Sequence, residues 1–284
     1  MVKQFNKIAI IGVGLIGGSL GLAVKAKGLA REVVGIGHHK HSIDRALWLG
    51  AIDRGTLDPS EGVAGADIVV LATPILSMAG LVKRAIPRLK NGCIVTDVGS
   101  TKSQLVKEME GILPKGIHFV GGHPMAGSEK RGVEQARKDL FENSVCIVTR
   151  TAATDTGSFD TVGRLWKALG ASVVALSPPA HDRIVSFISH LPHMVAFTML
   201  ASVDDRSLRF ASSGFSDATR IASSDADIWK DIAISNSGEI LKSIAAFKKN
   251  LSVLESAIRR KDGKALERFF KKARARREKL TQDL

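Results

Sequence analysis

The sequence predicts a doubly wound α/β domain with a mostly parallel sheet, followed by an all-helical domain. Short apolar strands alternate with helical stretches through residue 178, a glycine-rich turn follows the first strand, and no strand is predicted later. The chain has 284 residues, 44% hydrophobic and 24% charged, which is enough for two domains with buried cores. We therefore expect one domain over residues 1–178 and another over residues 179–284.

The first domain should contain seven strands, each a short run of β-branched residues bounded by turn-forming residues. The expected strands are 7–12, 32–37, 67–72, 93–98, 117–121, 144–149 and 172–176. The helical stretches that fit between them include 15–27, 42–49, 76–89 and 159–169. The first strands are almost entirely apolar, as expected for a parallel sheet covered by helices on both faces.

Helical periodicity dominates the second domain. Its expected helices are 181–202, 226–259 and 263–280. Residues 259–279 hold 11 lysines and arginines against 3 acids, a large part of the net charge of +13. A basic helix could bind nucleic acid, but no nucleic-acid motif accompanies it. We therefore interpret the charge as a solvated helix face and expect no nucleic-acid partner.

The composition favours a cytoplasmic protein without a membrane segment. Cys93 and Cys146 lie within apolar strand-like runs, so we predict buried thiols in a reducing compartment rather than a disulfide. Residues 8–24 are uncharged and resemble a secretory signal, but they contain 5 glycines whose spacing has another explanation. We expect no metal site.

The glycines near the N-terminus form a nucleotide-binding turn. Residues 12–17 read GVGLIG and fit G-x-G-x-x-G between an apolar strand and a helix-compatible run. Gly12 permits a tight turn, Gly14 lets a pyrophosphate approach the backbone, and Gly17 allows close packing of helix on strand. Free N–H groups at the helix start would face the phosphates. The turn predicts a Rossmann-type domain with cofactor-binding residues Gly12, Gly14, Leu15, Ile16 and Gly17.

The end of the second strand bears on the choice of cofactor. An acid is expected there if the chain holds the ribose 2′-hydroxyl of NAD. The sequence has Gly37 followed by His38, His39 and Lys40. Potentially cationic groups suit a 2′-phosphate, so the sequence slightly favours NADP over NAD, although Asp44 or a backbone group could serve NAD.

Later strands end in residues suited to redox chemistry. Thr73 and Pro74 end the third strand and would border the nicotinamide, and Ser100 follows the fourth, at the edge where open α/β sheets bind ligands. His123 follows the fifth strand on a tight Gly/Pro loop. A histidine there can accept a substrate hydroxyl proton while hydride leaves the same carbon. Ser100 could hydrogen-bond that histidine or the hydroxyl.

Five stretches of the chain form a specific set. They read GVGLIGGS (12–19), DVGSTK (97–102), GGHPMAGSE (121–129), SHLPH (189–193) and GFSDATRIA (214–222). Together they resemble the prephenate and arogenate dehydrogenase family of tyrosine biosynthesis, in that family's order. The resemblance implies a Rossmann-type domain and a helical domain that forms a homodimer. It also implies NAD(P)-dependent oxidative decarboxylation of prephenate to 4-hydroxyphenylpyruvate, or of arogenate to tyrosine.

The same resemblance implies roles for individual residues. His123 would take the hydroxyl proton, and Ser100 would orient His123 and contact the nicotinamide or the substrate. Arg220 would bind a substrate carboxylate as a bidentate fork. His193 would lie near the substrate side chain. Glu129 and Trp229 match positions near the mouth of the family's site, with Asp182 a weaker candidate there. Ser128, a polar residue of the His123 loop, is a further substrate-binding candidate.

Two alternatives stay open at this point. A β-hydroxyacid dehydrogenase would share the two-domain plan but rely on a lysine of the helical domain, which the His123 loop and Arg220 argue against. A non-catalytic redox sensor would bind NAD(P) and, through residues 259–279, nucleic acid. We expect no appended regulatory or chorismate-mutase segment, and prephenate and arogenate are equally compatible with the sequence.

Overall fold

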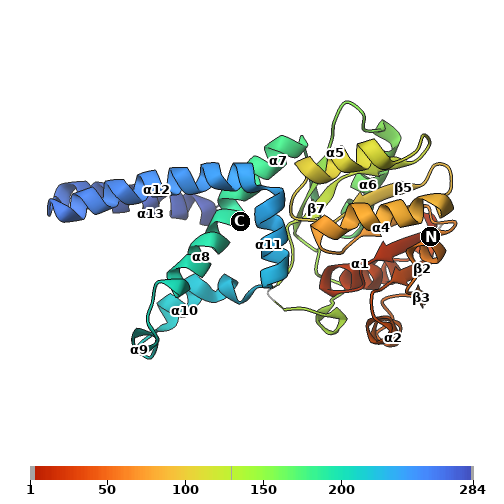
Figure 1. Ribbon diagram of the computed structural model, residues 1–284, viewed down its shortest axis with the longest axis horizontal. Helices are drawn as coiled ribbons and strands as arrows, with labels where there is room; N and C mark the ends of the chain where they lie inside the picture. The colour runs from red at the N-terminus through yellow and green to blue at the C-terminus, as the bar shows by residue number, and fades with distance from the viewer. Residues whose placement is uncertain (1–3, 129, 283–284) are drawn as a thin grey trace. The chain divides into compact units, whose positions relative to one another are not determined.

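The computed structural model describes residues 4–128 and 130–282. The chain divides into two compact units, Met1–Ser237 and Gly238–Leu284. The first unit holds both sheets and all of the predicted site residues that the structure describes. Figure 1 labels the elements of both units.

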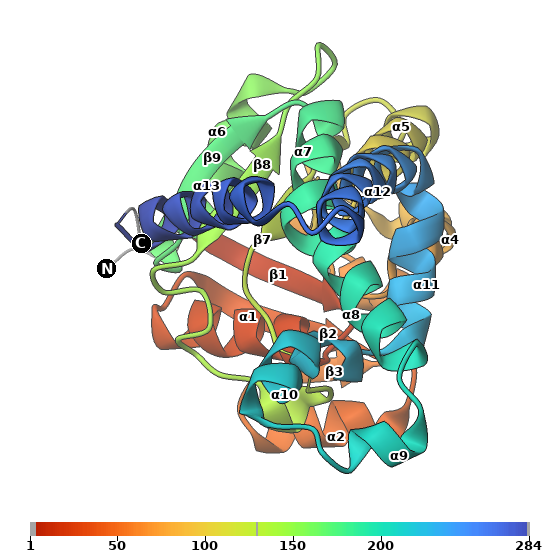
Figure 2. The same ribbon diagram turned by 90° about the vertical axis from the view of Figure 1, so that its left-hand side faces the viewer.

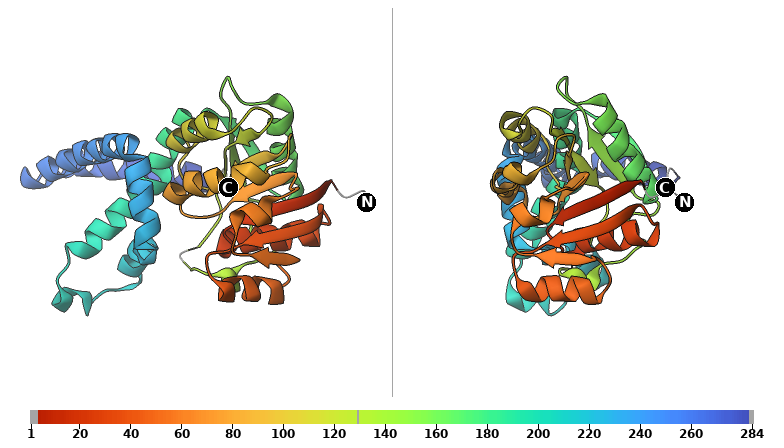
Figure 3. Two further views of the ribbon diagram at one scale, coloured as in Figure 1. Left: turned by 45° about the vertical axis from the view of Figure 1, so that its right-hand side comes forward. Right: turned by 90° about the vertical axis from the view of Figure 1, so that its right-hand side faces the viewer.

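A parallel six-stranded sheet lies at the centre of the first unit, and its strands run side by side in Figure 3. They are β1 (Phe5–Ile11), β2 (Ala30–Ile36), β3 (Arg54–Thr56), β4 (Ile68–Leu71), β5 (Ile94–Asp97) and β6 (His118–Val120). Their order is β3-β2-β1-β4-β5-β6. Because β1 pairs with both β2 and β4, the strand order reverses beside β1, and a doubly wound sheet binds its ligand at that point.

Helices cover both faces of this sheet. They are α1 (Leu15–Ala26), α2 (Lys40–Trp48), α3 (Pro59–Val63), α4 (Met78–Ala85), α5 (Ser103–Ile112) and α6 (Thr156–Ala168). Side chains alternate along β1, so Ile8 and Ile10 join the core under α1, α2 and α6. Ala9 and Ile11 join the opposite core, under α3, α4 and α5. Short 3₁₀ turns complete this part of the chain, at Ile75–Ser77, Ile86–Arg88 and Val133–Gln135.

A second sheet of three strands follows, and it places His123. Its strands are β7 (Gly122–Pro124), β8 (Val145–Thr149) and β9 (Ser172–Leu176). β7 is antiparallel to β8, β8 is parallel to β9, and α6 packs beside β8 and β9 (Figure 2). His123 follows β6, the fifth of the predicted strands, as expected. It lies within a strand of a second sheet, however, and the expected loop at this position is wrong. The sequence does not predict strands β3 and β7 because their residues, RGT and GHP, contain no apolar β-branched run and are typical of turns.

After β9 the described residues form helices and turns only, as predicted. The helices of the first unit in this part are α7 (Pro178–Val185), α8 (Leu191–Ala201), α9 (Asp205–Leu208), α10 (Ser213–Thr219) and α11 (Ala226–Ser235). A π-helical turn over Ser186–His190 joins α7 to α8, and a 3₁₀ turn over Arg220–Ser223 follows α10. The predicted helix 181–202 is thus interrupted, and the predicted helix 226–259 divides at Asn236, which is the C-cap of α11.

The second unit begins at the second residue of α12 (Ser237–Arg259) and also contains α13 (Gly263–Gln282). Lys261 in the connection has φ +54°, the left-handed conformation that ends a helix. The lysines and arginines from Lys264 to Lys279 are exposed, and ion pairs such as Lys271 with Glu267 link neighbouring turns of α13. This arrangement is that of a solvated helix face.

Within the part of the chain that the structure describes, one helical run, Pro178–Ala201, is long and apolar enough to cross a membrane by length and composition alone. Four polar side chains of this run are buried in the first unit: His181, Asp182, Ser186 and His190. Buried polar groups of this kind are usual in a helix that packs against protein.

Candidate active site

The glycine turn after β1 has the geometry of a phosphate site. Gly12 has φ +101°, and a Cβ there would lie 2.5 Å from the carbonyl oxygen of Ala72. A Cβ on Gly17 would lie 1.9 Å from the carbonyl oxygen of Gly12, so both positions require glycine. A Cβ on Gly14 would instead meet open space, and no side chain caps the N-terminus of α1. The turn therefore offers backbone N–H groups and free space to an anion.

A cavity of about 560 Å³ lies beside this turn. Six of the predicted cofactor residues line it, namely Gly12, Gly14, His38, His39, Thr73 and Pro74. Lys40 makes a different contact, since its Nζ lies 2.7 Å from Oδ2 of Asp44 one helical turn away. The volume and the glycine cradle fit a dinucleotide such as NAD(P).

Two further cavities meet near the carboxyl end of β5. One of about 390 Å³ is lined by cofactor candidates that include Leu15 and Ile16, and one of about 430 Å³ contains His123. Ser100 and Ser128 line both cavities. The remaining predicted substrate residues in the larger cavity are His193, Arg220 and Trp229. Glu129 lies outside the described residues.

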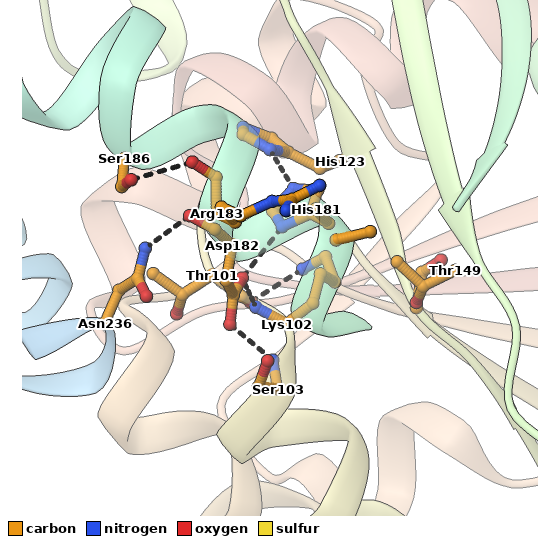
Figure 4. A network of polar contacts seen from close by, with 12 residues as sticks. Thr101, Lys102, Ser103, His123, Thr149, His181, Asp182, Arg183, Ser186 and Asn236 are labelled. Carbon is orange, nitrogen blue, oxygen red and sulfur yellow. Dashed lines mark hydrogen bonds and ion pairs between the residues drawn. The ribbon is translucent and has the colours of Figure 1, made fainter. Parts of the chain in front are cut away.

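His123 is buried and bonded through one ring nitrogen. Its Nδ1 lies 2.8 Å from Nε2 of His181, and Nδ1 of His181 lies 2.8 Å from Oδ1 of Asp182 (Figure 4). The sequence predicted Ser100 as the group that orients His123, whereas the structure gives this contact to His181. Burial lowers the pKa of His123 well below its usual value, and His181 and Lys102 act in the same direction. The ring is therefore neutral near pH 7 and able to accept a proton.

Asp182 lies behind His181, and the expectation that places it near the mouth of the site is wrong. Its carboxylate accepts the backbone N–H groups of Lys102 and Ser103, each at 2.8 Å, at the start of α5. Burial would raise the pKa of Asp182, but hydrogen bonds from His181 and Ser103 hold it below its usual value. Asp182 is thus a fixed, charged acceptor inside the protein.

A buried ion pair supports the same region. Lys102 Nζ lies 2.5 Å from Oδ2 of Asp97 and also donates to the backbone carbonyl oxygens of Gly99 and Thr101. Asp97 also accepts the N–H groups of Gly99 and Gly122, so it ties the end of β5 to β7. Asp97 and Lys102 are the first and last residues of the predicted DVGSTK stretch, but sequence reasoning assigned them no role.

His193 is held against an aromatic ring. It stacks on Trp229 with ring centroids 3.7 Å apart and an angle of 23° between the planes. Its Nδ1 lies 2.9 Å from the carbonyl oxygen of Ser189 and donates to it, which leaves Nε2 as an acceptor in the neutral ring. Burial lowers the pKa of His193, and the charge of Arg220 adds to the effect although the Ser189 contact opposes it.

His190 and Asn236 form a polar pair that sequence reasoning missed. Asn236 Nδ2 lies 3.1 Å from Nδ1 of His190 and 2.9 Å from the carbonyl oxygen of Asp182. Burial lowers the pKa of His190 to about 4. Both residues link the π-helical turn to α7 and α11. His190 is the first histidine of the SHLPH stretch, and that stretch is the signal by which the sequence could have pointed to it.

Three cationic side chains line the cavity that contains His123: Lys130, Arg131 and Arg220. Arg131 forms an ion pair with Asp225, which also caps α11 by accepting the N–H groups of Asp227 and Ile228. The cavity therefore combines a neutral base with positive charge, an arrangement suited to an anionic substrate. Across residues 4–128 and 130–282, no group of three or more His, Cys, Asp and Glu side chains could hold a metal ion.

Sequence profiles of known families match both parts of the chain. The nucleotide-binding domain of prephenate dehydrogenase matches residues 20–175, and the dimerization domain of prephenate dehydrogenase matches residues 177–272. The chain belongs to the prephenate dehydrogenase family. The resemblance expected from its five stretches is confirmed, and so is a Rossmann-type domain followed by helices.

Individual members of the family align over nearly the whole chain. Prephenate dehydrogenase of Bacillus subtilis is 36% identical over 99% of this chain and 77% of its own length. Cyclohexadienyl dehydrogenase of Zymomonas mobilis is 32% identical over 98% of this chain and 97% of its own length. The structure of Aquifex aeolicus prephenate dehydrogenase with hydroxyphenyl propionate and NAD⁺ has a TM-score of 0.92 at 34% identity, covering 99% of this chain and 100% of that one.

Proposed function

We propose that the cavity around His123 is the active site for oxidative decarboxylation of prephenate. The family shows that the chain is a nicotinamide-dependent dehydrogenase of tyrosine biosynthesis. The observation that carries the assignment of the site is the position of His123, a buried neutral histidine in the cavity that also contains Arg220. Ser100 lines this cavity and also the cavity of about 390 Å³ that contains Gly14, Leu15 and Ile16 of the glycine turn and α1.

In the proposed reaction His123 acts as the general base. The O–H bond of the substrate hydroxyl breaks as its proton passes to Nε2 of His123, and the electron pair forms a carbonyl at the ring carbon. The cofactor, when bound at the glycine turn, supplies the acceptor for the hydride that leaves this carbon. The C–C bond to the carboxylate on the opposite ring carbon then breaks and CO₂ leaves. The electron pair of that bond makes the ring aromatic, and the former carbonyl oxygen takes back the proton held by His123 to give the phenol. Ser100, at the junction of the cavities, would hydrogen-bond the hydroxyl or the nicotinamide.

The other residues of the cavity would hold the substrate. Arg220 would bind a carboxylate through two parallel N–H groups, which suits a substrate with two carboxylates. His193, stacked on Trp229, would contact the substrate side chain, and Ser128 would add a hydroxyl at the boundary with the cofactor. Glu129, adjacent in sequence to Ser128, remains a proposed substrate residue.

We propose prephenate as the preferred substrate and arogenate as the alternative. Prephenate carries a carbonyl where arogenate carries an ammonium group, so prephenate has the greater net negative charge. Lys130 and Arg220 favour that charge, while Asp225, which lines the same cavity, offsets the charge of Arg131. Relatives named prephenate dehydrogenase and cyclohexadienyl dehydrogenase support a substrate of this class.

For the cofactor we propose NADP slightly over NAD. His38 and His39 line the cavity beside the glycine turn, and Gly37 stands where an acid would hold a 2′-hydroxyl. Lys40 is paired with Asp44 in this structure, so the histidines carry most of the argument. The relative from Aquifex aeolicus was solved with NAD⁺, which makes NAD the alternative to test.

We also propose that the protein is a homodimer through residues 179–284. The profile matching residues 177–272 is that of a dimerization domain. Several large apolar side chains between these residues are exposed in the single chain, among them Ile188 at 63%, Phe210 at 87% and Leu241 at 65%. A second copy could cover such surface. Sedimentation at micromolar concentration should give twice the mass of the chain, and a monomer would contradict the proposal.

We propose a cytoplasmic enzyme with a domain boundary near residue 178, a small-molecule substrate, and no membrane or nucleic-acid partner. The buried thiols of Cys93 and Cys146 fit a reducing compartment. The exposed cations of α13 are accounted for by solvation and by pairs along the helix.

The deciding experiment is steady-state turnover with prephenate and with arogenate, each with NAD and with NADP. The proposal expects the highest kcat/KM with prephenate and a modest advantage for NADP. Turnover of arogenate alone would show that arogenate, not prephenate, is the substrate. A higher kcat/KM with NAD would show that NAD, not NADP, is the preferred cofactor. Absence of turnover with every pair would contradict the proposed site.

A further inference from the structure

The hydrogen-bond chain behind His123 begins at a fixed acceptor. Asp182 receives the N–H groups of Lys102 and Ser103 at the N-terminus of α5, where a negative charge is stabilised by the helix. A carboxylate in this position has no proton to give. Its contact with Nδ1 of His181, at 2.8 Å, therefore requires a proton on that nitrogen.

The direction of the next bond follows from the first. His181 has no exposed surface, and burial lowers its pKa although Asp182 opposes the shift, so the ring is neutral. A neutral ring with its proton on Nδ1 presents a lone pair on Nε2. The contact of 2.8 Å with Nδ1 of His123 must then carry the proton of His123. The proton of neutral His123 is therefore on Nδ1, and Nε2 carries a lone pair that can accept a proton.

We propose that His181, held by Asp182, is a positioning residue that keeps His123 in the one tautomer able to act as a base from the cavity. This inference rests on the proposed role of His123. Without the contact, neutral histidine would divide between two tautomers, and the one with its proton on Nε2 cannot accept from the substrate.

The chain of contacts also accommodates the product of proton transfer. When Nε2 of His123 gains the substrate proton, the proton on Nδ1 stays in its bond to His181, so no proton has to leave the buried chain. His181 Nε2 accepts from the resulting imidazolium, and the charge of Asp182 lies one ring further away. The packing of the two rings, with centroids 5.0 Å apart at 61°, keeps His123 aligned before and after the transfer.

Two substitutions at one position separate positioning from a purely structural role. In His181→Gln the amide oxygen can accept from His123 while the amide nitrogen donates to Asp182, so the direction of the chain is preserved. In His181→Leu both bonds are lost. Ser186→Ala serves as the control, because Ser186 is buried in the next helical turn and bonds only to the carbonyl oxygen of Arg183 among the contacts described.

The readouts are ¹⁵N shifts of the His123 ring in the holoenzyme, kcat and KM for prephenate, and the pH profile of kcat/KM. We expect a protonated Nδ1 and an unprotonated Nε2 in the wild type and in His181→Gln, with kcat within about threefold. We expect mixed tautomers in His181→Leu, a kcat lower by about 10²-fold and a KM within about twofold. Ser186→Ala should match the wild type.

A proton on Nε2 of His123 in the wild-type enzyme near pH 7 would overturn the proposal, whether or not the variants fold. So would a His181→Leu enzyme that keeps wild-type kcat, or a His181→Gln enzyme that loses as much as the leucine variant. These outcomes are distinct from failure of the proposed base. That failure would appear as turnover retained in His123→Asn, with the tautomer of wild-type His123 unaffected.

Discussion

Lys102 and Asp97 form an ion pair in which neither side chain has exposed surface, with Nζ 2.5 Å from Oδ2. They lie five positions apart in the chain, and the pair closes the turn after β5 that also contains Ser100. Because Asp97 also receives the N–H of Gly122, the pair joins the central sheet to the strand that carries His123.

Removing one partner of the Asp97–Lys102 pair should lower the free energy of unfolding. Lys102→Met leaves the carboxylate of Asp97 buried without its cation, and we expect the free energy of unfolding to fall by about 3–5 kcal/mol. Lys90→Met is the matched control, because Lys90 pairs with Asp67 at the surface and should lose less than about 1 kcal/mol. Urea unfolding of both variants measures the difference. Equal losses would show that burial of the pair does not matter.

The buried His190 predicts a loss of stability in mild acid. Its pKa is lowered from 6.5 to about 4, so the unfolded chain takes up a proton more readily below pH 6.5. Its contribution to stability is therefore present above that pH and is lost as the pH falls toward 4. Between about pH 7 and about pH 5 this amounts to roughly 2 kcal/mol. His190→Gln should reduce the fall in unfolding free energy over this interval, whereas Ser186→Ala should keep the wild-type dependence.

His123→Asn should fold and bind the cofactor but lose most turnover. Asparagine keeps a polar side chain in the cavity but has no basic nitrogen, and loss of a general base lowers the rate by about 10²–10⁴-fold. Steady-state kinetics gives the rate, and quenching of protein fluorescence by reduced cofactor shows that binding survives. More than half of the wild-type rate in this variant would end the assignment of His123.

Arg220→Lys should raise the KM for prephenate much more than the KM for the cofactor. Lysine keeps the charge but loses the planar pair of donors that matches a carboxylate. Arg209→Lys is the control, because Arg209 is exposed at the end of α9 and does not line the cavity. If the Arg220 variant only melts at a lower temperature, with substrate affinity unchanged, Arg220 has a structural role.

Gly37→Asp should lower kcat/KM for NADP while sparing or improving it for NAD. The new carboxylate would repel a 2′-phosphate and could accept from a 2′-hydroxyl. A Cβ at this position would lie 2.8 Å from Cδ1 of Ile43, so Gly37→Ala is needed as a control that brings the same contact without the charge. The ratio of the two cofactors in the aspartate variant, relative to the alanine variant, is the measurement. An unchanged ratio would remove the basis for favouring NADP.

Much of the fold follows from local pattern. The apolar strands up to β6, the glycine turn and the change to helices after β9 are visible in sequence because each depends on residues close together in the chain. The same holds for candidates that follow strands, such as Thr73 and Ser100, since parallel strands bring their carboxyl ends to one edge. Strand β7 is not visible in the sequence because Gly122 and Pro124 are typical of a turn, and its place in a second sheet depends on pairing with β8.

By itself the sequence determined the class of this protein: a dinucleotide-binding turn, a histidine near the sheet edge and an arginine among the helices, each recognisable from neighbouring residues. Only the tertiary structure decided what holds that histidine. His181 is 58 residues from His123, and Asp182 is 80 residues from the backbone N–H of Lys102 that it binds. Contacts over such separations produce no periodic pattern or local motif in the sequence. They form because α7 packs against α5 in the folded chain. The direction of the bonds follows from burial, which keeps His181 neutral, and burial is a property of the folded chain.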